Sequence, residues 1–173
     1  FDPIGGLQIF VTENGGSAEV TIDNTTGEMV VTDEDGDEAF RQLATDVPSI
    51  FVTGTVADSQ AVLFSDDLNL PTGILVEASI EATFFNGAVD AQLIESTSGL
   101  VVIDGELTAT TGFSLVSAQN TNVSLGADIS AGNVLLGNST ITLTNNVTAT
   151  GFVDLSDATL QENGTPWSLT VNG

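Results

Sequence analysis

The chain has 173 residues, a formal net charge of −23 and one basic residue, Arg41, and it lacks histidine and cysteine. Lys and Arg side chains supply most of the affinity for phosphate, so this composition argues against a nucleic-acid partner, and anionic lipid surfaces should repel the chain. Because 41% of the residues are hydrophobic and no run of 18 apolar residues occurs, we expect a folded domain without direct membrane insertion.

Residues 1–50 are expected to form an N-terminal arm and acidic cap, ahead of a β-repeat body at 51–173. Residues 18–22 and 28–32 alternate around a polar turn and predict a β-hairpin. Residues 37–44 are the one helix-like stretch, which should end before Pro48 because the residue ahead of proline avoids the helical region.

The densest polar cluster runs from Thr32 to Glu38. Asp33, Asp35 and Asp37 alternate around Gly36 and could place several oxygens on one Ca²⁺ ion, which takes 6–8 oxygen ligands. The spacing does not match the EF-hand loop. Two interpretations therefore stay open: a calcium site, which makes calcium the one candidate cofactor, and a solvated acidic turn.

The body carries a short apolar rhythm that recurs five times, with starts about 20 residues apart. Each copy reads apolar, any residue, apolar, three turn residues, apolar, small or polar, then Ala or Leu. The copies are 62–70, 83–91, 101–109, 123–131 and 141–149. A unit of this length cannot bury its apolar face alone, so it must stack on its neighbours, as in a solenoid.

The period-2 pairs predict strands, because alternate side chains of a strand point to one face. The turn triplets are rich in Gly, Asn and Asp, which tolerate left-handed backbone. We therefore expect an all-β fold, a parallel β-helix of about five rungs of 18–22 residues; the alternative is an antiparallel β-sandwich or jelly roll. In the solenoid, equivalent residues should be buried in register one rung apart, and the test set is Val123, Leu125, Ile129, Ile141, Leu143 and Val147.

Residues 62–156, and most strictly the Thr/Asn/Gly-rich rungs from Gly99 to Ser156, resemble the parallel β-helix repeats of filamentous-haemagglutinin-type and autotransporter-type adhesins. The resemblance implies a parallel β-helix. Many β-helix proteins cleave acidic polysaccharides, but that activity implies basic residues in the site, and here Arg41 stands alone. Since His, Cys, Lys and Tyr are absent, most nucleophiles and bases are missing, and we do not expect an enzyme.

Both ends of the chain are apolar and alternating. Ile4, Leu7, Ile9 and Val11 follow this pattern at the N-terminus, where Gly5 and Gly6 supply a hinge. The uncharged C-terminal strand presents Trp167, Leu169 and Val171. Neither segment carries the charges that blunt an edge strand. Both are expected to pair with another copy; the alternative is that each strand closes its own sheet.

Asn-x-Ser/Thr sequons lie mainly in the back half of the chain. The candidates for glycosylation are Asn122, Asn138 and Asn146. The alternative is that asparagine simply turns corners in a chain this rich in Ser, Thr and Asn.

These features favour an extracellular structural subunit that self-assembles head to tail into a filament or sheath by strand pairing between subunits. Its partner would be itself, in a homopolymer. Because the chain begins at Phe1, we interpret it as the mature form of a secreted, cell-surface protein whose signal segment has been removed. The alternative function is a monomeric adhesin or carbohydrate-binding module.

Overall fold

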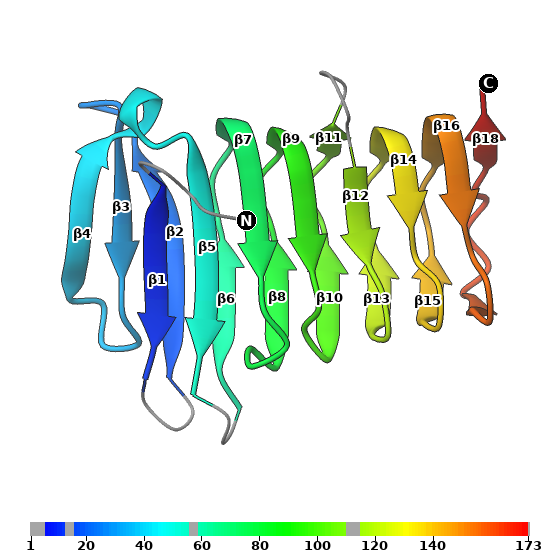
Figure 1. The fold of residues 1–173 in the computed structure, drawn as a ribbon, viewed down its shortest axis with the longest axis horizontal. Coiled ribbons are helices and arrows are strands. Elements are labelled where there is room, and N and C mark those ends of the chain that lie inside the picture. The colour runs from blue at the N-terminus through cyan, green and yellow to red at the C-terminus, as the bar shows by residue number, and fades with distance from the viewer. Residues whose placement is uncertain (1–5, 13–15, 56–58, 110–114, 173) are drawn as a thin grey trace.

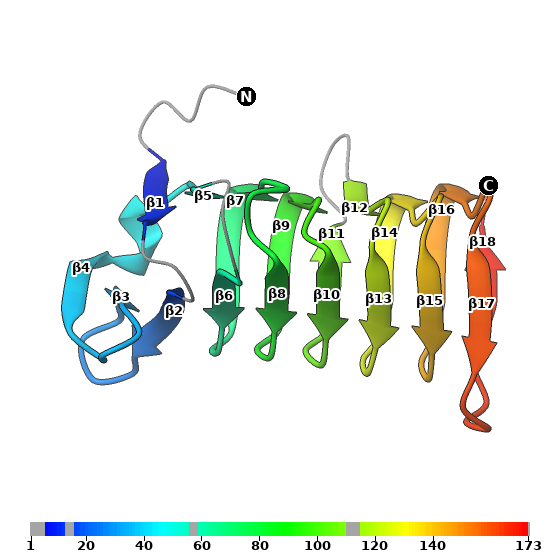
Figure 2. The same ribbon diagram turned by 90° about the horizontal axis from the view of Figure 1, so that it is seen from below.

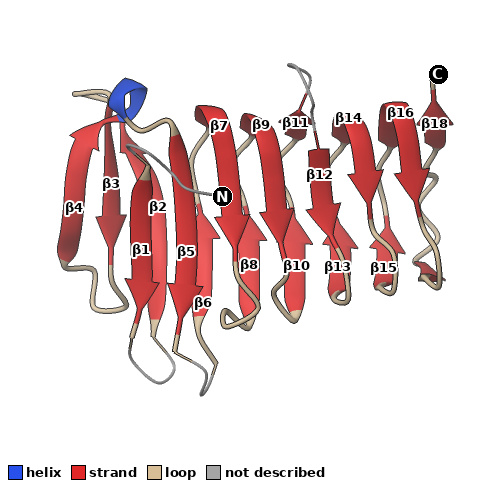
Figure 3. Cartoon of the chain, in the orientation of Figure 1, coloured by secondary structure: helices blue, strands red, loops and turns tan. Residues whose placement is uncertain are grey.

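The computed structural model describes residues 6–12, 16–55, 59–109 and 115–172, and these residues are almost entirely β-strand (Figure 3). One 3-10 helix, η1 (Ala44–Asp46), interrupts the strands of this part of the chain. The strands form two nine-stranded sheets that run the length of the molecule on opposite sides of one core (Figures 1 and 2). The acidic cap and the repeat body share this core, since residue 50 lies inside a strand of the first sheet.

Sheet A contains β1 (Leu7–Val11), β5 (Ser49–Gly54), β7 (Leu68–Val76), β9 (Val89–Ser96), β11 (Leu107–Ala109), β12 (Leu115–Ala118), β14 (Ile129–Leu135), β16 (Val147–Asp154) and β18 (Leu169–Val171). Sheet B contains β2 (Ser17–Asp23), β3 (Glu28–Thr32), β4 (Glu38–Leu43), β6 (Ala61–Phe64), β8 (Ala82–Phe85), β10 (Leu100–Ile103), β13 (Asn122–Leu125), β15 (Thr140–Leu143) and β17 (Thr159–Glu162).

Each predicted repeat forms one coil of a solenoid. A strand of sheet B leads through a tight corner into a strand of sheet A, and a second corner starts the next coil, as β6, β7 and β8 show in Figure 1. Neighbouring coils pair in parallel in both sheets, and the antiparallel pairs among the described strands are β2–β3 and β3–β4. A sandwich or jelly roll would be antiparallel. The β-solenoid is therefore confirmed, and the alternative is wrong.

The side chains predicted to stack one coil apart do so, and all of them are at most 3% exposed. In the register of the sheets they form three pairs: Val123 with Ile141, Leu125 with Leu143, and Ile129 with Val147. The same columns continue towards the N-terminus, where the rings of Phe64 and Phe85 stack with centroids 5.1 Å apart. The core is therefore a set of in-register columns along the solenoid axis.

One column contains a polar residue that the core accommodates locally. Thr83 lies between Val62 and Val101 in the register of sheet B. Its Oγ1 is 2.6 Å from the hydroxyl of Ser98 and 3.0 Å from that of Ser96, and the two serine hydroxyls are 3.0 Å apart. A buried hydroxyl without a partner costs about 1–3 kcal/mol. This ring of three hydroxyls removes that cost inside the core.

Glycine at the tight corners is explained by stacking rather than by left-handed backbone. None of the five corner triplets contains a residue with positive φ, although Gly, Asn and Asp tolerate that conformation. A Cβ on Gly87 would lie 2.2 Å from the backbone of Asp66, and one on Gly105 would lie 2.0 Å from the carbonyl oxygen of Gly87. Left-handed residues occur instead at the opposite corners, where Asn120 and Asn138 have φ of 59° and 54°.

The N-terminal end is closed by strands that extend sheet B. β2 and β3 form the predicted hairpin, and β4 adds a third strand (Figure 2). The helix predicted over 37–44 is wrong: this segment is β4 followed by the start of η1. Pairing with β3 overrides the local preference, and Phe40 packs half-buried against the core.

Candidate functional site

The last coil leaves core positions uncovered at the C-terminal end of the solenoid. Leu160, Leu169 and Val171 are 42%, 41% and 49% exposed. Their register partners one coil earlier are Ile141, Val147 and Ala149, none more than 1% exposed. The difference arises because no further coil covers β17 and β18 among the described residues. Within the described residues, this end of the solenoid therefore presents an apolar surface that a further coil, from the same chain or from another copy, would cover.

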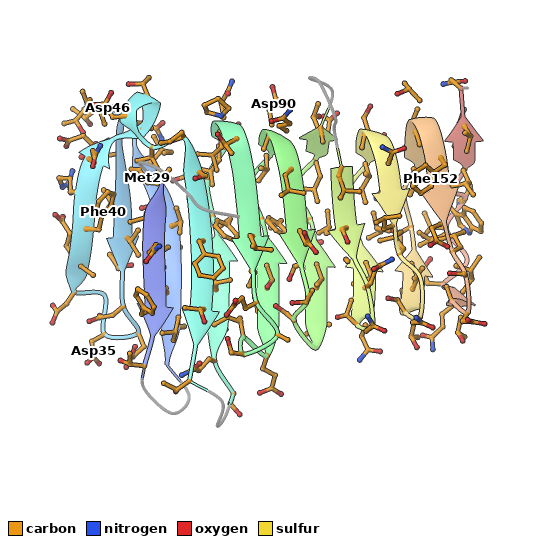
Figure 4. The ribbon with its side chains drawn as sticks, viewed as in Figure 1. Met29, Asp35, Phe40, Asp46, Asp90 and Phe152 are labelled. Carbon is orange, nitrogen blue, oxygen red and sulfur yellow. The ribbon has the colours of Figure 1, made fainter. Side chains whose placement is uncertain are left out.

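The C-terminal surface is partly closed by the segment between β17 and β18. Trp167 packs half-buried against the core, and the hydroxyl of Ser168 donates a 2.7 Å hydrogen bond to Oδ1 of Asn146. Phe152, on β16, is 52% exposed on the outer side of sheet A (Figure 4).

Sequence reasoning found Trp167 but missed Leu160. The signal was present, because residues 159–162 repeat the Thr-apolar-polar pattern of 140–143.

The N-terminal arm lies in its own sheet. β1 pairs in parallel with β5, with Leu7 opposite Ile50. Ile9 and Val11 are 7% and 5% exposed and belong to the core of their own chain, while Leu7 is partly buried against it. Ile4 lies outside the described residues. What β1 offers a second copy is thus its outer backbone edge, because two of the predicted interface side chains are already buried.

An open groove of about 510 Å³ runs along that outer edge. Ile9, Val11 and Val31 contribute apolar lining, and Asp33 and Asp35 contribute carboxylates. β1 and β18 are the two edge strands of sheet A. All neighbouring strands from β1 to β18 pair in parallel. The groove therefore lies beside the strand edge that faces away from β18.

Sheet B ends differently, on the charged strand β4. The Arg41 guanidinium forms ion pairs with Glu38 at 2.8 Å, Asp23 at 3.0 Å and Glu28 at 3.1 Å. Its hydrogen bonds with Glu38, Glu28 and Asp23 raise the pKa of Arg41, and the Arg41 hydrogen bond lowers the pKa of Glu38. Charged residues blunt an edge strand against pairing with another chain. Sequence reasoning missed this clamp, because its members are 3 to 18 residues apart.

The predicted calcium ligands lie in the turn between β3 and β4, and Figure 4 shows Asp35 at its exposed tip. Oδ1 of Asp33 accepts hydrogen bonds from the backbone N–H groups of Asp35 at 3.1 Å and Asp37 at 2.9 Å. Asp33 therefore stabilises the turn itself. Within the described residues, no group of three or more Asp or Glu side chains is arranged to hold a metal ion. Calcium binding here stays a prediction.

The three candidate glycosylation sites are all exposed. Asn122 begins β13, and Asn138 lies at a left-handed corner. The side chain of Asn146 links neighbouring coils. Its Nδ2 donates a 3.2 Å hydrogen bond to Oδ1 of Asp128, and its Oδ1 accepts one from the hydroxyl of Ser168. Exposure makes modification sterically feasible at each site, and occupancy stays a prediction.

Comparisons with known protein families, curated proteins and solved structures found no match. The resemblance to adhesin-type repeats is thus one of repeat style, and the fold assignment rests on the structure. In the described part of the chain, no helix has the length and apolar character needed to cross a membrane.

Proposed function

We propose that this protein is an extracellular structural subunit that assembles head to tail into a filament or sheath. The observation that carries the proposal is the last described coil, whose core positions at Leu160, Leu169 and Val171 are 41–49% exposed within the described residues. A following coil would bury these side chains, at roughly 25 cal/mol per Å² of apolar surface before association costs. The N-terminal end of the next copy is the proposed source of that coil.

Strand direction is compatible with this joint. All strands of sheet A are parallel, so translating one copy along the solenoid axis brings β18 beside β1 in the parallel sense. Leu169 and Val171 would then enter the groove lined by Ile9, Val11 and Val31. The joint is an addition of edge to edge, because β1 already occupies its own sheet. A heterologous contact of this kind does not close, and it produces an open polymer.

Charge favours head-to-tail order over head-to-head order. Residues 1–100 carry 18 of the 24 carboxylates, and residues 101–173 carry six. Two N-terminal ends in contact would oppose the acidic turns at Asp33, Glu34 and Asp35. The C-terminal end brings few like charges to the same groove. The role proposed is structural rather than enzymatic, in an extracellular setting where salt or Ca²⁺ screens the acidic cap.

A second candidate function is a monomeric cell-surface adhesin or carbohydrate-binding module. It is favoured by the charged strand β4, because Glu38 and Arg41 blunt the N-terminal edge of sheet B. In that case no second copy would cover Leu160, Leu169 and Val171 in solution. The two candidates differ in a property that can be measured directly, which is the size of the particle at high protein concentration.

The test compares the full chain with Val171→Asp by negative-stain microscopy and sedimentation velocity. Val171 is 49% exposed, so the substitution should leave the fold intact. We expect linear polymers from the unaltered chain and their loss in the variant. Thr148→Asp, on the outer side of sheet A, is the matched control and should polymerise. A full chain that stays monomeric at millimolar concentration with calcium would favour the adhesin instead.

A further inference from the structure

The outward positions of six consecutive strands of sheet B carry no ionisable residue. In β6, β8, β10, β13, β15 and β17, residues alternate between core positions and outward positions. The twelve outward residues are Ala61, Leu63, Ala82, Phe84, Leu100, Val102, Asn122, Ser124, Thr140, Thr142, Thr159 and Gln161. None is ionisable. In these six strands the one charged residue is Glu162, which takes the register position of Leu143.

This absence of charge is selective, because the chain carries 24 carboxylates. The outward positions of sheet A include Asp90, Glu95 and Asp154. The tight corners carry further acids, and Glu19 on β2 lies beside Leu63 at the N-terminal border of the neutral face. A neutral strip bordered by acids is the surface on which a second copy meets the least like-charge repulsion.

The neutral face has two halves of different chemistry. On β6, β8 and β10 the outward residues are aliphatic or aromatic, and Leu63, Phe84 and Val102 form one in-register column. On β13, β15 and β17 the same column continues with hydroxyl and amide groups. The strands lie side by side in a straight row (Figure 2). Such a face can pack against another sheet at about 10 Å separation.

We propose that this face is a lateral interface between two copies of the chain. A two-fold axis parallel to the solenoid axis superposes the apolar half on its counterpart and the hydroxyl half on its counterpart. Twelve outward residues fall short of the roughly 20–30 per partner in a standard interface. The dimer is therefore weak and concentration-dependent, and the two acidic caps lie on the same side of it. Salt should strengthen it by screening that repulsion.

The chemistry favours a second copy over an uncharged polysaccharide. Sugar rings stack their apolar C–H faces on aromatic side chains, and Phe84 is the one aromatic residue among the twelve. A glycan on Asn122 would stand on the interface, so lateral pairing and modification of Asn122 exclude each other. The lateral interface is independent of the end-on joint, because it uses a sheet face rather than the strand edges.

The test uses the full chain with Val171→Asp, in which end-on assembly is blocked, produced without glycosylation. Sedimentation equilibrium should give a monomer–dimer equilibrium that tightens with added NaCl. Adding Phe84→Glu or Val102→Glu should weaken association by at least about tenfold, because each places two like charges in the interface. Ser130→Glu, outward on sheet A, is the control and should leave it unchanged. Circular dichroism verifies that each variant is folded.

A monomer at every concentration and salt level would overturn the lateral interface, as would equal weakening by the Ser130 control. A monomer that binds an uncharged polysaccharide through Phe84 would replace the second copy with that ligand. Failure of the end-on proposal is seen separately, as polymers that persist in Val171→Asp or as a full chain that never exceeds a dimer.

Discussion

Leu143 lies directly over Leu125, one coil further along, in the parallel register of β13 and β15. Both side chains are at most 3% exposed. Shortening Leu143 therefore opens a cavity beside Leu125, in a buried column that continues through Ile103 and Phe85. Leu143→Ala should lower the free energy of unfolding by about 2–5 kcal/mol in chemical denaturation. Leu160→Ala, one coil nearer the open end and 42% exposed, is the control and should cost clearly less. If both variants lose the same free energy of unfolding, Leu143 does not pack in a buried column.

Gly105 tests the stacking of the tight corners. A Cβ at this position would lie 2.0 Å from the carbonyl oxygen of Gly87, which is backbone and cannot rotate away. Gly105→Ala should lower the free energy of unfolding by about 1–3 kcal/mol, as overpacking does. Gly99→Ala is the matched control, because a Cβ on Gly99 would lie 3.3 Å from its nearest neighbour, the carbonyl oxygen of Glu81. If thermal denaturation shows both variants equally stable, close stacking of the corners does not require glycine at position 105.

The Arg41 clamp should make stability depend on pH. The pKa of Asp23 is lowered first by its backbone hydrogen bond with Thr25 and then by Arg41, and that of Glu38 is lowered by Arg41. Because both pKa values are lowered on folding, these carboxylates stabilise the fold at neutral pH. That contribution is lost as the pH falls through the lowered values, below the ordinary 3.8 for Asp23 and 4.5 for Glu38.

Arg41→Ala should therefore melt at a lower temperature than the unaltered chain at neutral pH. The difference in melting temperature between the two chains should become smaller once the pH falls below the pKa values of these acids. Differential scanning calorimetry across this range measures it, with Gln42→Ala on the same strand as the control. A gap that is constant with pH would show that Arg41 acts through packing of its stem rather than through its charge.

Calcium should raise the melting temperature by binding near Asp33, Asp35 and Asp37. Mg²⁺ or NaCl at matched ionic strength should do less, because Ca²⁺ accepts more oxygen ligands and a more irregular geometry. The Asp35→Asn variant should lose the calcium-specific part of the shift, while Asp46→Asn, on η1, should keep it. Equal shifts from all three salts would mean that screening alone acts on the acidic cap.

Glycan occupancy should differ among the sequons. In a host that attaches N-linked glycans, Asn138 should be modified most fully, because it is exposed and no side-chain hydrogen bond is found for it in the described structure. Asn146 should be modified less, since its amide donates to Asp128. Intact-mass and peptide mass spectrometry give the occupancies, with Asn138→Gln as the control. If the chain carries no glycan in such a host, these asparagines serve only to form the corners of the coils.

The alternation of apolar residues locates the strands at both ends of the chain, but it does not predict whether their side chains are buried or exposed. Leu169 and Val171 were recognised as an alternating apolar strand, and the structure shows them exposed on the last coil. Ile9 and Val11 were recognised by the same alternation, yet they are buried against their own chain. Alternation states which side chains share a face of a strand. It does not state whether that face meets the core of the same chain or of another copy.

What the sequence determined by itself was the repeat: a period of about 20 residues, the strands within it and the residues that face inwards, such as Leu125 and Leu143. These follow from local geometry, because side chains alternate along a strand and identical coils must stack. Only the tertiary structure decided that 38–43 is a strand, that β1 closes its own sheet, and that Leu160 is uncovered while Met29 is buried. These depend on which distant strands become neighbours, and a strand acquires its exposure from those neighbours rather than from its own residues.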